Sequence, residues 1–282
     1  MDFNTAISQI LILFVIMFIG AAAKKSKIIN DSIQDSISVL LMQIALPALI
    51  LSSSNITRTD EVLPNMINIL MVTIISYILT ILFCILTAKS LRFDKKTASV
   101  FISLIVFGNV GFMGFPVARA FFAEAGVFYA TTANLVFTAF LWTYGILLFN
   151  KQGKIDFKKL LNLGSISTLI TLFMFAFQLK FPYFLQTAFD LIGKMTTPLS
   201  MLLIGTLIAE IDAVNLVSNK KVYLVSVIKL VLLPLATAYI LKFMGFNAMV
   251  ISLFASVGVF ITTLLSILTL PLTVYILTNF VL

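Results

Sequence analysis

The feature that most constrains this chain is a series of apolar runs, most of them close to the length that crosses a lipid bilayer. A helix needs about 20 apolar residues to span the hydrocarbon core. The runs occupy residues 6–23, 35–54, 65–88, 97–120, 126–149, 164–180, 185–209, 221–242, 246–257 and 258–280. The ninth run is too short to cross. The pattern predicts an all-α polytopic membrane protein with the lipid bilayer as its surroundings.

Composition removes several function classes. Hydrophobic residues make up 61% of the chain and charged residues 11%, whereas soluble domains carry about 25% charged residues. The net charge is +8, but the basic residues cluster between apolar runs, which indicates membrane orientation rather than nucleic-acid binding. Histidine is absent and Cys84 is the one cysteine. We therefore expect no metal site, no cofactor and no catalytic residue.

The basic clusters also predict the orientation in the membrane. With the N-terminus outside, thirteen basic residues fall in cytoplasmic loops and four, including Arg119, in outer loops. Cytoplasmic loops carry the excess of Lys and Arg in membrane proteins. We therefore expect a multi-pass protein of the cell (plasma) membrane with both termini outside.

One stretch, residues 97–120, is apolar yet interrupted in its middle. Gly108, Gly111, Gly114 and Pro116 punctuate it, and Asn109 lies among them. Glycine tolerates unusual dihedral angles and proline removes an amide donor, so we expect a helix broken at membrane depth. Broken backbone occurs there only where protein buries it or where it lines a cavity. The alternative is a glycine-rich packing face between ordinary helices.

An internal repeat becomes visible when the two halves of the chain are compared. Pro47 in the second run and Pro198 in the seventh are each followed by an apolar stretch and then a polar loop. The pattern predicts a first repeat over 1–149, a cytoplasmic linker over 150–163 and a second repeat over 164–282. Because each repeat holds five spans, an odd number, the two copies must be inverted in the membrane.

The same comparison shows that the second repeat is shorter. Phe93 precedes Gly126 by 33 residues, whereas Phe246 precedes Gly258 by 12, so about 21 residues are missing between 257 and 258. These residues would form the second broken helix. Either the natural protein carries them or the helix is truly absent. We favour the first explanation, because 250–257 begins a helix that cannot span the membrane.

Several separated motifs resemble the auxin efflux carrier family, which includes PIN-like carriers and bacterial malate and malonate permeases. They include Gly108-Asn-Val-Gly-Phe-Met-Gly-Phe-Pro116, Ala45-Leu-Pro47, Trp142-Thr-Tyr-Gly145 and the stretch from Thr197 to Ala209. The resemblance implies ten helices in two inverted five-helix repeats, a crossover fold whose fourth and ninth helices are broken. It also implies organic-anion transport and is compatible with a homodimer. The ninth helix has no counterpart here.

Polar and flexible residues near the break are the predicted substrate site. Asn109 can donate to a carboxylate, together with the freed amides of Val110 and Gly111, and Gly108 allows close approach. Gln43 and Asn134 are further polar residues within spans, although such residues often only join helices. Lys194 either provides a counter-charge or pairs with Asp190, four residues earlier. Gly114, Pro116, Pro47 and Pro198 have structural roles at the predicted breaks. The hydroxyls that flank Pro198, those of Thr196, Thr197 and Ser200, are expected to bond the carbonyl that this proline frees.

Taken together, these features predict a secondary active transporter of small organic anions, such as dicarboxylates or auxin-like acids. Transport would proceed by alternating access at the crossover. An anion channel is the first alternative, and a membrane-embedded enzyme is the second. A proton, sodium or the membrane potential could drive the transport, and the sequence does not choose among them.

Overall fold

The computed structural model describes residues 3–57, 59–108, 110–149, 161–210, 228 and 232–246. Within this part the chain is helical and contains no strand, as expected for a polytopic membrane protein. The chain divides into two compact units, each assembled from separate segments. The first comprises Met1–Ile67, Val110–Leu135 and Leu161–Glu210, and the second comprises Asn68–Asn109, Val136–Leu160 and Ile211–Leu282.

The elements of the first unit come from both sides of the predicted linker. They are α1 (Phe3–Lys25), α2 (Asp31–Leu40), the π-helical turn η1 (Leu41–Ala45), α3 (Leu46–Ser52), the 3₁₀ turn η2 (Ser53–Asn55), the π-helical turn η3 (Val110–Gly114), the first part of α6 (Phe115–Phe140), α8 (Leu163–Ala176), α9 (Tyr183–Lys194) and α10 (Thr196–Ala209).

The second unit contains the longest helix of the described chain. Its elements are α4 (Val62–Ser90), whose first residues belong to the first unit, α5 (Lys95–Val106), the end of α6, the π-helical turn η4 (Leu141–Gly145), α7 (Ile146–Phe149) and α13 (Leu233–Phe243).

Four helical stretches of the described chain are long and apolar enough to cross a membrane: Asp31–Asn55, Val62–Ser90, Phe115–Phe149 and Tyr183–Ala209. They contain or overlap the spans predicted at 35–54, 65–88, 126–149 and 185–209. In addition, α1 covers the predicted span 6–23, and α8 covers most of 164–180. The runs 246–257 and 258–280 lie almost entirely outside the described residues, as does much of 221–242, so the inverted ten-helix arrangement stays a prediction.

Three helices begin at a side chain that accepts hydrogen bonds from the backbone. Asn30 accepts from the Ile33 amide before α2, and Asn162 accepts from the Ser165 amide before α8. Asp94 accepts from the amides of Lys96 and Thr97 before α5. The first amides of a helix have no partner within the helix, so these N-caps fix where each one starts.

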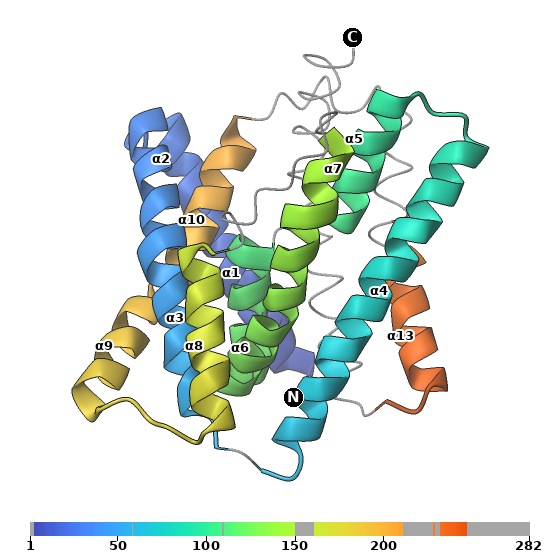
Figure 1. Ribbon diagram of the computed structural model, residues 1–282. Coiled ribbons are helices and arrows are strands. Elements are labelled where there is room, and N and C mark those ends of the chain that lie inside the picture. Colours follow the sequence, from blue (N-terminus) through green and yellow to red (C-terminus); the bar gives the residue numbers. More distant parts are fainter. Residues whose placement is uncertain are drawn as a thin grey trace. The chain divides into compact units, whose positions relative to one another are not determined.

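Close backbone contact holds α1 against α10 in the first unit (Figure 1). A Cβ atom at Gly205 would collide with the Met17 carbonyl oxygen, and one at Gly20 with the Leu202 carbonyl oxygen. Small residues let helix backbones approach in a membrane, where dispersion rather than the hydrophobic effect joins helices. The two glycines are thus a packing device of this helix pair.

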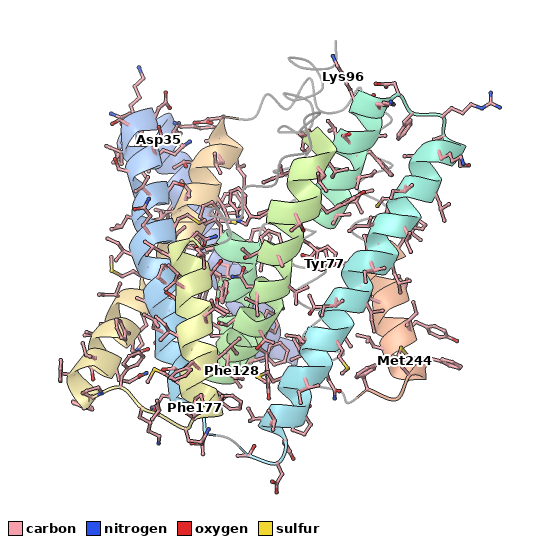
Figure 2. All side chains as sticks on the ribbon, viewed as in Figure 1. Asp35, Tyr77, Lys96, Phe128, Phe177 and Met244 are labelled. Carbon is pink, nitrogen blue, oxygen red and sulfur yellow. The ribbon has the colours of Figure 1, made fainter. Side chains whose placement is uncertain are left out.

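The remaining helices of the first unit pack through large side chains. Figure 1 shows α3 beside α8 and α9, which contact it. Phe128, labelled in Figure 2, lies on α6 with its ring centroid 4.7 Å from that of Phe175 on α8. Both rings are almost completely buried, and they form part of the apolar interior of this unit.

The second unit has its own core of buried aliphatic and aromatic side chains. Cys84 on α4 and Phe101 on α5 belong to it, and Tyr77 packs against it. Tyr77, labelled in Figure 2, stacks on Phe140 with 5.0 Å between ring centroids. This core holds α4 and α5 together, and α5 leads directly to the predicted break.

Candidate functional site

The predicted break in the fourth span is confirmed, and it lies at the glycine rather than at the proline. Helix α5 ends at Val106, and Phe107 has extended backbone dihedrals, φ −98° and ψ 101°. Gly108 has no regular secondary structure, and helical structure resumes at Val110. Asn109, the central residue of the predicted site, lies outside the described residues.

Pro116 lies inside a helical segment beyond the break. It is the second residue of α6, two residues after the end of the π-helical turn η3. Pro47 has the same relation to η1 at the start of α3. A proline within a helix removes one amide donor and clashes with the carbonyl four residues earlier, and a wider π-helical turn relieves that clash. Both prolines are buried, as is Gly114 at the end of η3.

A second interruption separates the fourth span from the fifth. Ala123 within α6 has φ 51° and ψ −138°, so α6 consists of two helices that meet at this residue. Positive φ is unusual for alanine. After the interruption the backbone at residue 126 passes close to Ala118. A Cβ atom at Gly126 would collide with the Ala118 carbonyl oxygen, so only glycine fits there. The interruption falls between the spans predicted at 97–120 and 126–149, which agrees with those boundaries.

The segment after the break packs on the second span and on α10. A Cβ atom at Gly111 would lie 3.6 Å from Leu46 Cδ2 and 3.9 Å from Met42 Sδ. Phe112 packs against the buried cluster of Leu41, Ala45 and Leu203. The two π-helical turns η1 and η3 are thus neighbours in the first unit. Val110 and Gly111 therefore lie near the turn that carries Gln43.

The other predicted polar residues occupy different environments. The Gln43 side chain is exposed on η1. Asn134 lies on α6, beyond the interruption at Ala123, and is 8% exposed. Pro198 is exposed in the first turn of α10. The structure therefore brings Gly111 beside the turn that carries Gln43, whereas Asn134 lies on the part of α6 beyond Ala123.

Lys194 forms an ion pair with Asp190, with 2.5 Å between Nζ and Oδ2. This is the pairing that the sequence offered as the alternative to a free counter-charge. Asp190 also binds Arg119, with 3.1 Å between Arg119 Nη2 and Asp190 Oδ1, and Arg119 binds Glu124 at 3.0 Å. The four residues form one network with no net charge, and the Arg119 side chain is only 17% exposed. Arg119 is thus more enclosed than we expected from its place in a predicted outer loop.

Two hydroxyl groups near Pro198 differ from expectation. Sequence reasoning gives the hydroxyls that flank this proline the task of bonding the carbonyl that it frees. Thr196 and Ser200 are fully buried, and their hydroxyl oxygens have no hydrogen-bond partner in the described part of the chain. That expectation is wrong for both residues. In contrast, Thr171 donates to the Ile50 carbonyl oxygen at 3.0 Å and joins α8 to α3.

Sequence reasoning missed the link between Arg119 and Asp190, because 71 residues separate them and only the folded chain brings them together. It also missed the π-helical turns, although a proline two residues after each of η1 and η3 is a usable signal. Within the described residues, no group of three or more His, Cys, Asp and Glu side chains is placed to hold a metal ion.

Comparison with known proteins identifies the family of the chain. The model of a family described as "Membrane transport protein" matches residues 5–159. An uncharacterized transporter of Methanocaldococcus jannaschii is 26% identical over 209 residues, which cover 70% of this chain and 67% of that protein. Both findings point to a transporter rather than an enzyme. With more than half of its length matched, the chain belongs to the membrane transport protein family, that of auxin efflux and PIN-like carriers.

Proposed function

We propose that this membrane transporter is a secondary carrier of small organic anions, such as dicarboxylates or auxin-like carboxylic acids. The observation that carries the proposal is the helix break between Val106 and Val110. The first amides of a helix have no partner within it, and the helix dipole favours negative charge there. A carboxylate is the substrate group that suits such a position.

The residues at the break have distinct proposed roles. Asn109 donates from its amide to the carboxylate, together with the backbone amides of Val110 and Gly111. Gly108 lets the substrate approach the backbone, since it has no side chain. Gln43 is a second polar contact, because η1 lies beside η3. The other proposed site residues are Asn134, which lies further along α6, and Lys194, which binds Asp190.

Transport would proceed by alternating access, with the break as a hinge. The described chain passes between the two compact units at Ile67/Asn68 inside α4, at Leu135/Val136 inside α6, and in the break between Gly108 and Val110. Hinges are a few residues at the ends of elements that absorb large dihedral changes. Phe107 and Gly108 have this position.

The surroundings of the carrier follow from the sequence. We place it in the plasma membrane with both termini outside, on the basis of the basic loops. The proposal includes two inverted repeats, 1–149 and 164–282, joined by the linker 150–163, and a homodimer as a possible assembly. It also includes a second broken helix, to be tested by the intact mass of the natural protein against the 31.1 kDa of this chain.

Uptake into proteoliposomes tests the function. Vesicles preloaded with unlabelled malate, malonate or indole-3-acetate receive a trace of the labelled anion outside. A carrier shows saturable counterflow, whereas an anion channel shows flux without exchange. Ion and pH gradients imposed one at a time would then identify the coupling. If none of the three anions is exchanged or taken up, the proposed substrate class is wrong.

Substitution of Asn109 tests the site. Hydrogen bonds to charged groups contribute about 1.5–3 kcal/mol, so Asn109→Ala is expected to lower kcat/KM by at least about tenfold. Asn55→Ala is the matched control, because Asn55 is exposed in the turn η2. Unchanged kinetics for Asn109→Ala would remove Asn109 from the site. Gly108→Val should also lower kcat/KM, since its side chain would obstruct both the hinge and the substrate.

A further inference from the structure

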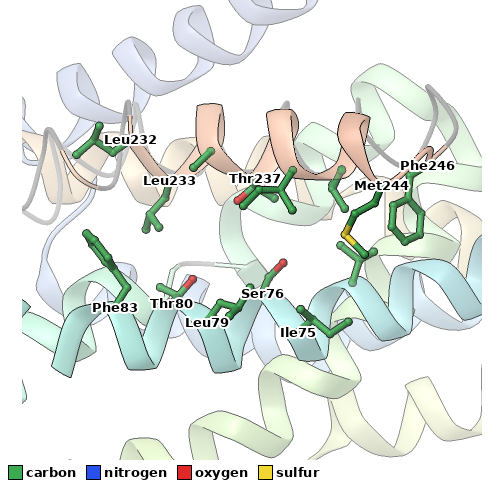
Figure 3. Close-up of a pocket in the computed structure, with 14 residues that line it drawn as sticks. Ile75, Ser76, Leu79, Thr80, Phe83, Leu232, Leu233, Thr237, Met244 and Phe246 are labelled. Atoms are coloured by element: carbon green, nitrogen blue, oxygen red, sulfur yellow. The ribbon is translucent and has the colours of Figure 1, made fainter. Parts of the chain in front are cut away.

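A cavity of about 370 Å³ lies between α4 and α13 in the second unit (Figure 3). Its lining residues run from Val72 to Phe83 on α4 and from Leu232 to Phe246 on and beside α13. Small-molecule sites in proteins have volumes of about 300–1,000 Å³ and are mostly apolar with a few placed polar groups. The cavity meets this description in size, and its chemistry can be examined residue by residue.

Three hydroxyl groups are the polar part of the lining. Ser76 and Thr80 are one helical turn apart on α4, and Thr237 lies on α13. Figure 3 shows the Ser76 and Thr80 oxygens directed from α4 towards α13, with the Thr237 oxygen in the same space. Within the part of the chain that the structure describes, none of the fourteen lining residues is charged. The lining therefore suits a neutral molecule.

These hydroxyls differ from the other threonines of the same helix. Thr73 donates to the Ile69 carbonyl oxygen at 2.6 Å, and Thr87 donates to that of Phe83 at 2.8 Å. Such bonds within the helix are the usual way to satisfy a hydroxyl in a membrane. In the described part of the chain, Ser76, Thr80 and Thr237 have no hydrogen-bond partner. Their hydrogen-bonding capacity is thus available to a ligand in the cavity.

The depth of the hydroxyls limits what that ligand can be. Ser76 is the central residue of the candidate span Val62–Ser90, which places it about 21 Å from either helix end at 1.5 Å per residue. Phospholipid ester and head groups lie at the edges of a hydrocarbon core about 30 Å thick. A phospholipid would therefore present only methylene groups here and leave the hydroxyls unsatisfied.

We propose that the cavity between α4 and α13 binds a neutral, membrane-soluble amphiphile, an apolar chain or ring with one hydroxyl or carbonyl group. The polar group bonds to Ser76, Thr80 and Thr237, and the apolar part lies against the leucine, isoleucine and phenylalanine side chains of both helices. This site differs in its chemistry from the proposed anion site, since its described lining contains neither a charged residue nor a helix break. Its test does not depend on transport.

Photolabelling of the full chain in phospholipid nanodiscs tests the proposal. The probe is a twelve-carbon primary alcohol that carries a diazirine in its chain, and the matched probe is the corresponding alkane. Labelled peptides are located by mass spectrometry. We expect the alcohol to label α4 and α13 about tenfold more than the alkane, since tenfold corresponds to about 1.4 kcal/mol, close to one net hydrogen bond. Unlabelled 1-dodecanol should compete.

Two variants and a control complete the test. The triple variant Ser76→Ala, Thr80→Val, Thr237→Val should lower labelling by the alcohol to the level of the alkane. Ala236→Trp, which fills the cavity, should abolish labelling by both probes. Thr87→Val, outside the cavity on the same helix, should change neither. Equal labelling by the two probes in the unmodified chain, no labelling by either, or alcohol labelling that survives the triple variant would each overturn the proposal.

Discussion

Arg119 on α6 and Asp190 on α9 form an ion pair, with 3.1 Å between Nη2 and Oδ1, although 71 residues separate them in the sequence. Asp190 also binds Lys194, and Arg119 also binds Glu124. The Arg119 Nη1 atom is buried and has no hydrogen-bond partner in the described part of the chain. The pair ties the segment that follows the helix break to α9 within the first unit.

This pair gives the first prediction. Asp190→Asn removes the common partner of two cations and should lower the free energy of unfolding by roughly 1–2 kcal/mol, between the values for exposed and buried pairs. Arg119→Gln should lower the free energy of unfolding by about the same amount as Asp190→Asn. Glu124→Gln should have a smaller effect, because the Glu124 side chain is 54% exposed. Thermal unfolding in detergent of the unmodified chain, Asp190→Asn, Arg119→Gln and the double variant would measure the coupling energy of the pair, and additive effects would show that the pair contributes nothing.

The contact between α1 and α10 gives the second prediction. Gly205→Ala places a methyl group against the Met17 carbonyl oxygen, and forcing backbones apart in a packed interior costs about 1–3 kcal/mol. Gly111→Ala is the matched control, since its methyl group would meet Leu46 and Met42 at ordinary contact distances. We expect a lower unfolding temperature for Gly205→Ala only. Equal unfolding temperatures for the two variants would mean that α1 and α10 accommodate the added methyl group without strain.

The third prediction concerns the end of α1. Hydrogen bonds to Asp31 and then Glu210 raise the pKa of the Lys24 ammonium above its ordinary value of 10.5. Since the pKa is raised by folding, Lys24 contributes its full stabilisation below pH 10.5 and loses it as the pH rises through the folded-state pKa. The difference in unfolding temperature between the unmodified chain and Lys24→Met should therefore shrink between pH 9 and pH 12.

Lys25→Met serves as the control for this measurement, because Lys25 is exposed beside Lys24 and has no ion pair within the described residues. Its effect on the unfolding temperature should be small at both pH values. If the difference for Lys24→Met stays constant with pH, the interaction with Asp31 and Glu210 does not stabilise the fold.

The N-cap of α5 gives the fourth prediction. Hydrogen bonds from the Thr97 side chain and from backbone amides hold the pKa of the Asp94 carboxyl below its ordinary value of 3.8. Folding lowers this pKa, so the cap stabilises fully above pH 3.8 and weakens as the pH falls through the folded-state value. Hydrogen exchange at the start of α5, corrected for intrinsic rates, should show more opening at pH 2.5 than at pH 5.5. Asp94→Asn should remove this dependence while it keeps the cap.

The helices and the break could be predicted from the sequence, because both depend on local properties. Apolar runs of membrane length correspond to α1, α4, α8 and the α9–α10 stretch. The break after Val106 follows from a glycine among apolar residues. The separation of the fourth and fifth spans at Ala123 could also be predicted from the sequence. Gly126 follows it, at the point where the backbone passes close to Ala118.

The side-chain partners could not be predicted, because they depend on which helices pack together. Lys194 could be a counter-charge for the substrate or the partner of Asp190. The sequence does not choose between these two roles, because the choice depends on Asp190 and on the distant Arg119. The unpartnered hydroxyls of Thr196 and Ser200 contradict a local rule that Thr73 and Thr87 obey. The cavity requires both α4 and α13, whose lining residues are more than 140 positions apart.

The π-helical turn η1 has a consequence for comparing this chain with its relatives. Relative to an α-helix, a π-helical turn holds one extra residue, and one residue corresponds to about 100° of rotation. A helical wheel drawn with a single period from Asp31 to Ser52 therefore misplaces everything after Ala45 by about 100°. Met42, Gln43 and Ile44 are exposed, whereas all of 45–50 is buried. Alignments in this family should accept a one-residue gap here, since deleting one position of η1 restores a regular helix.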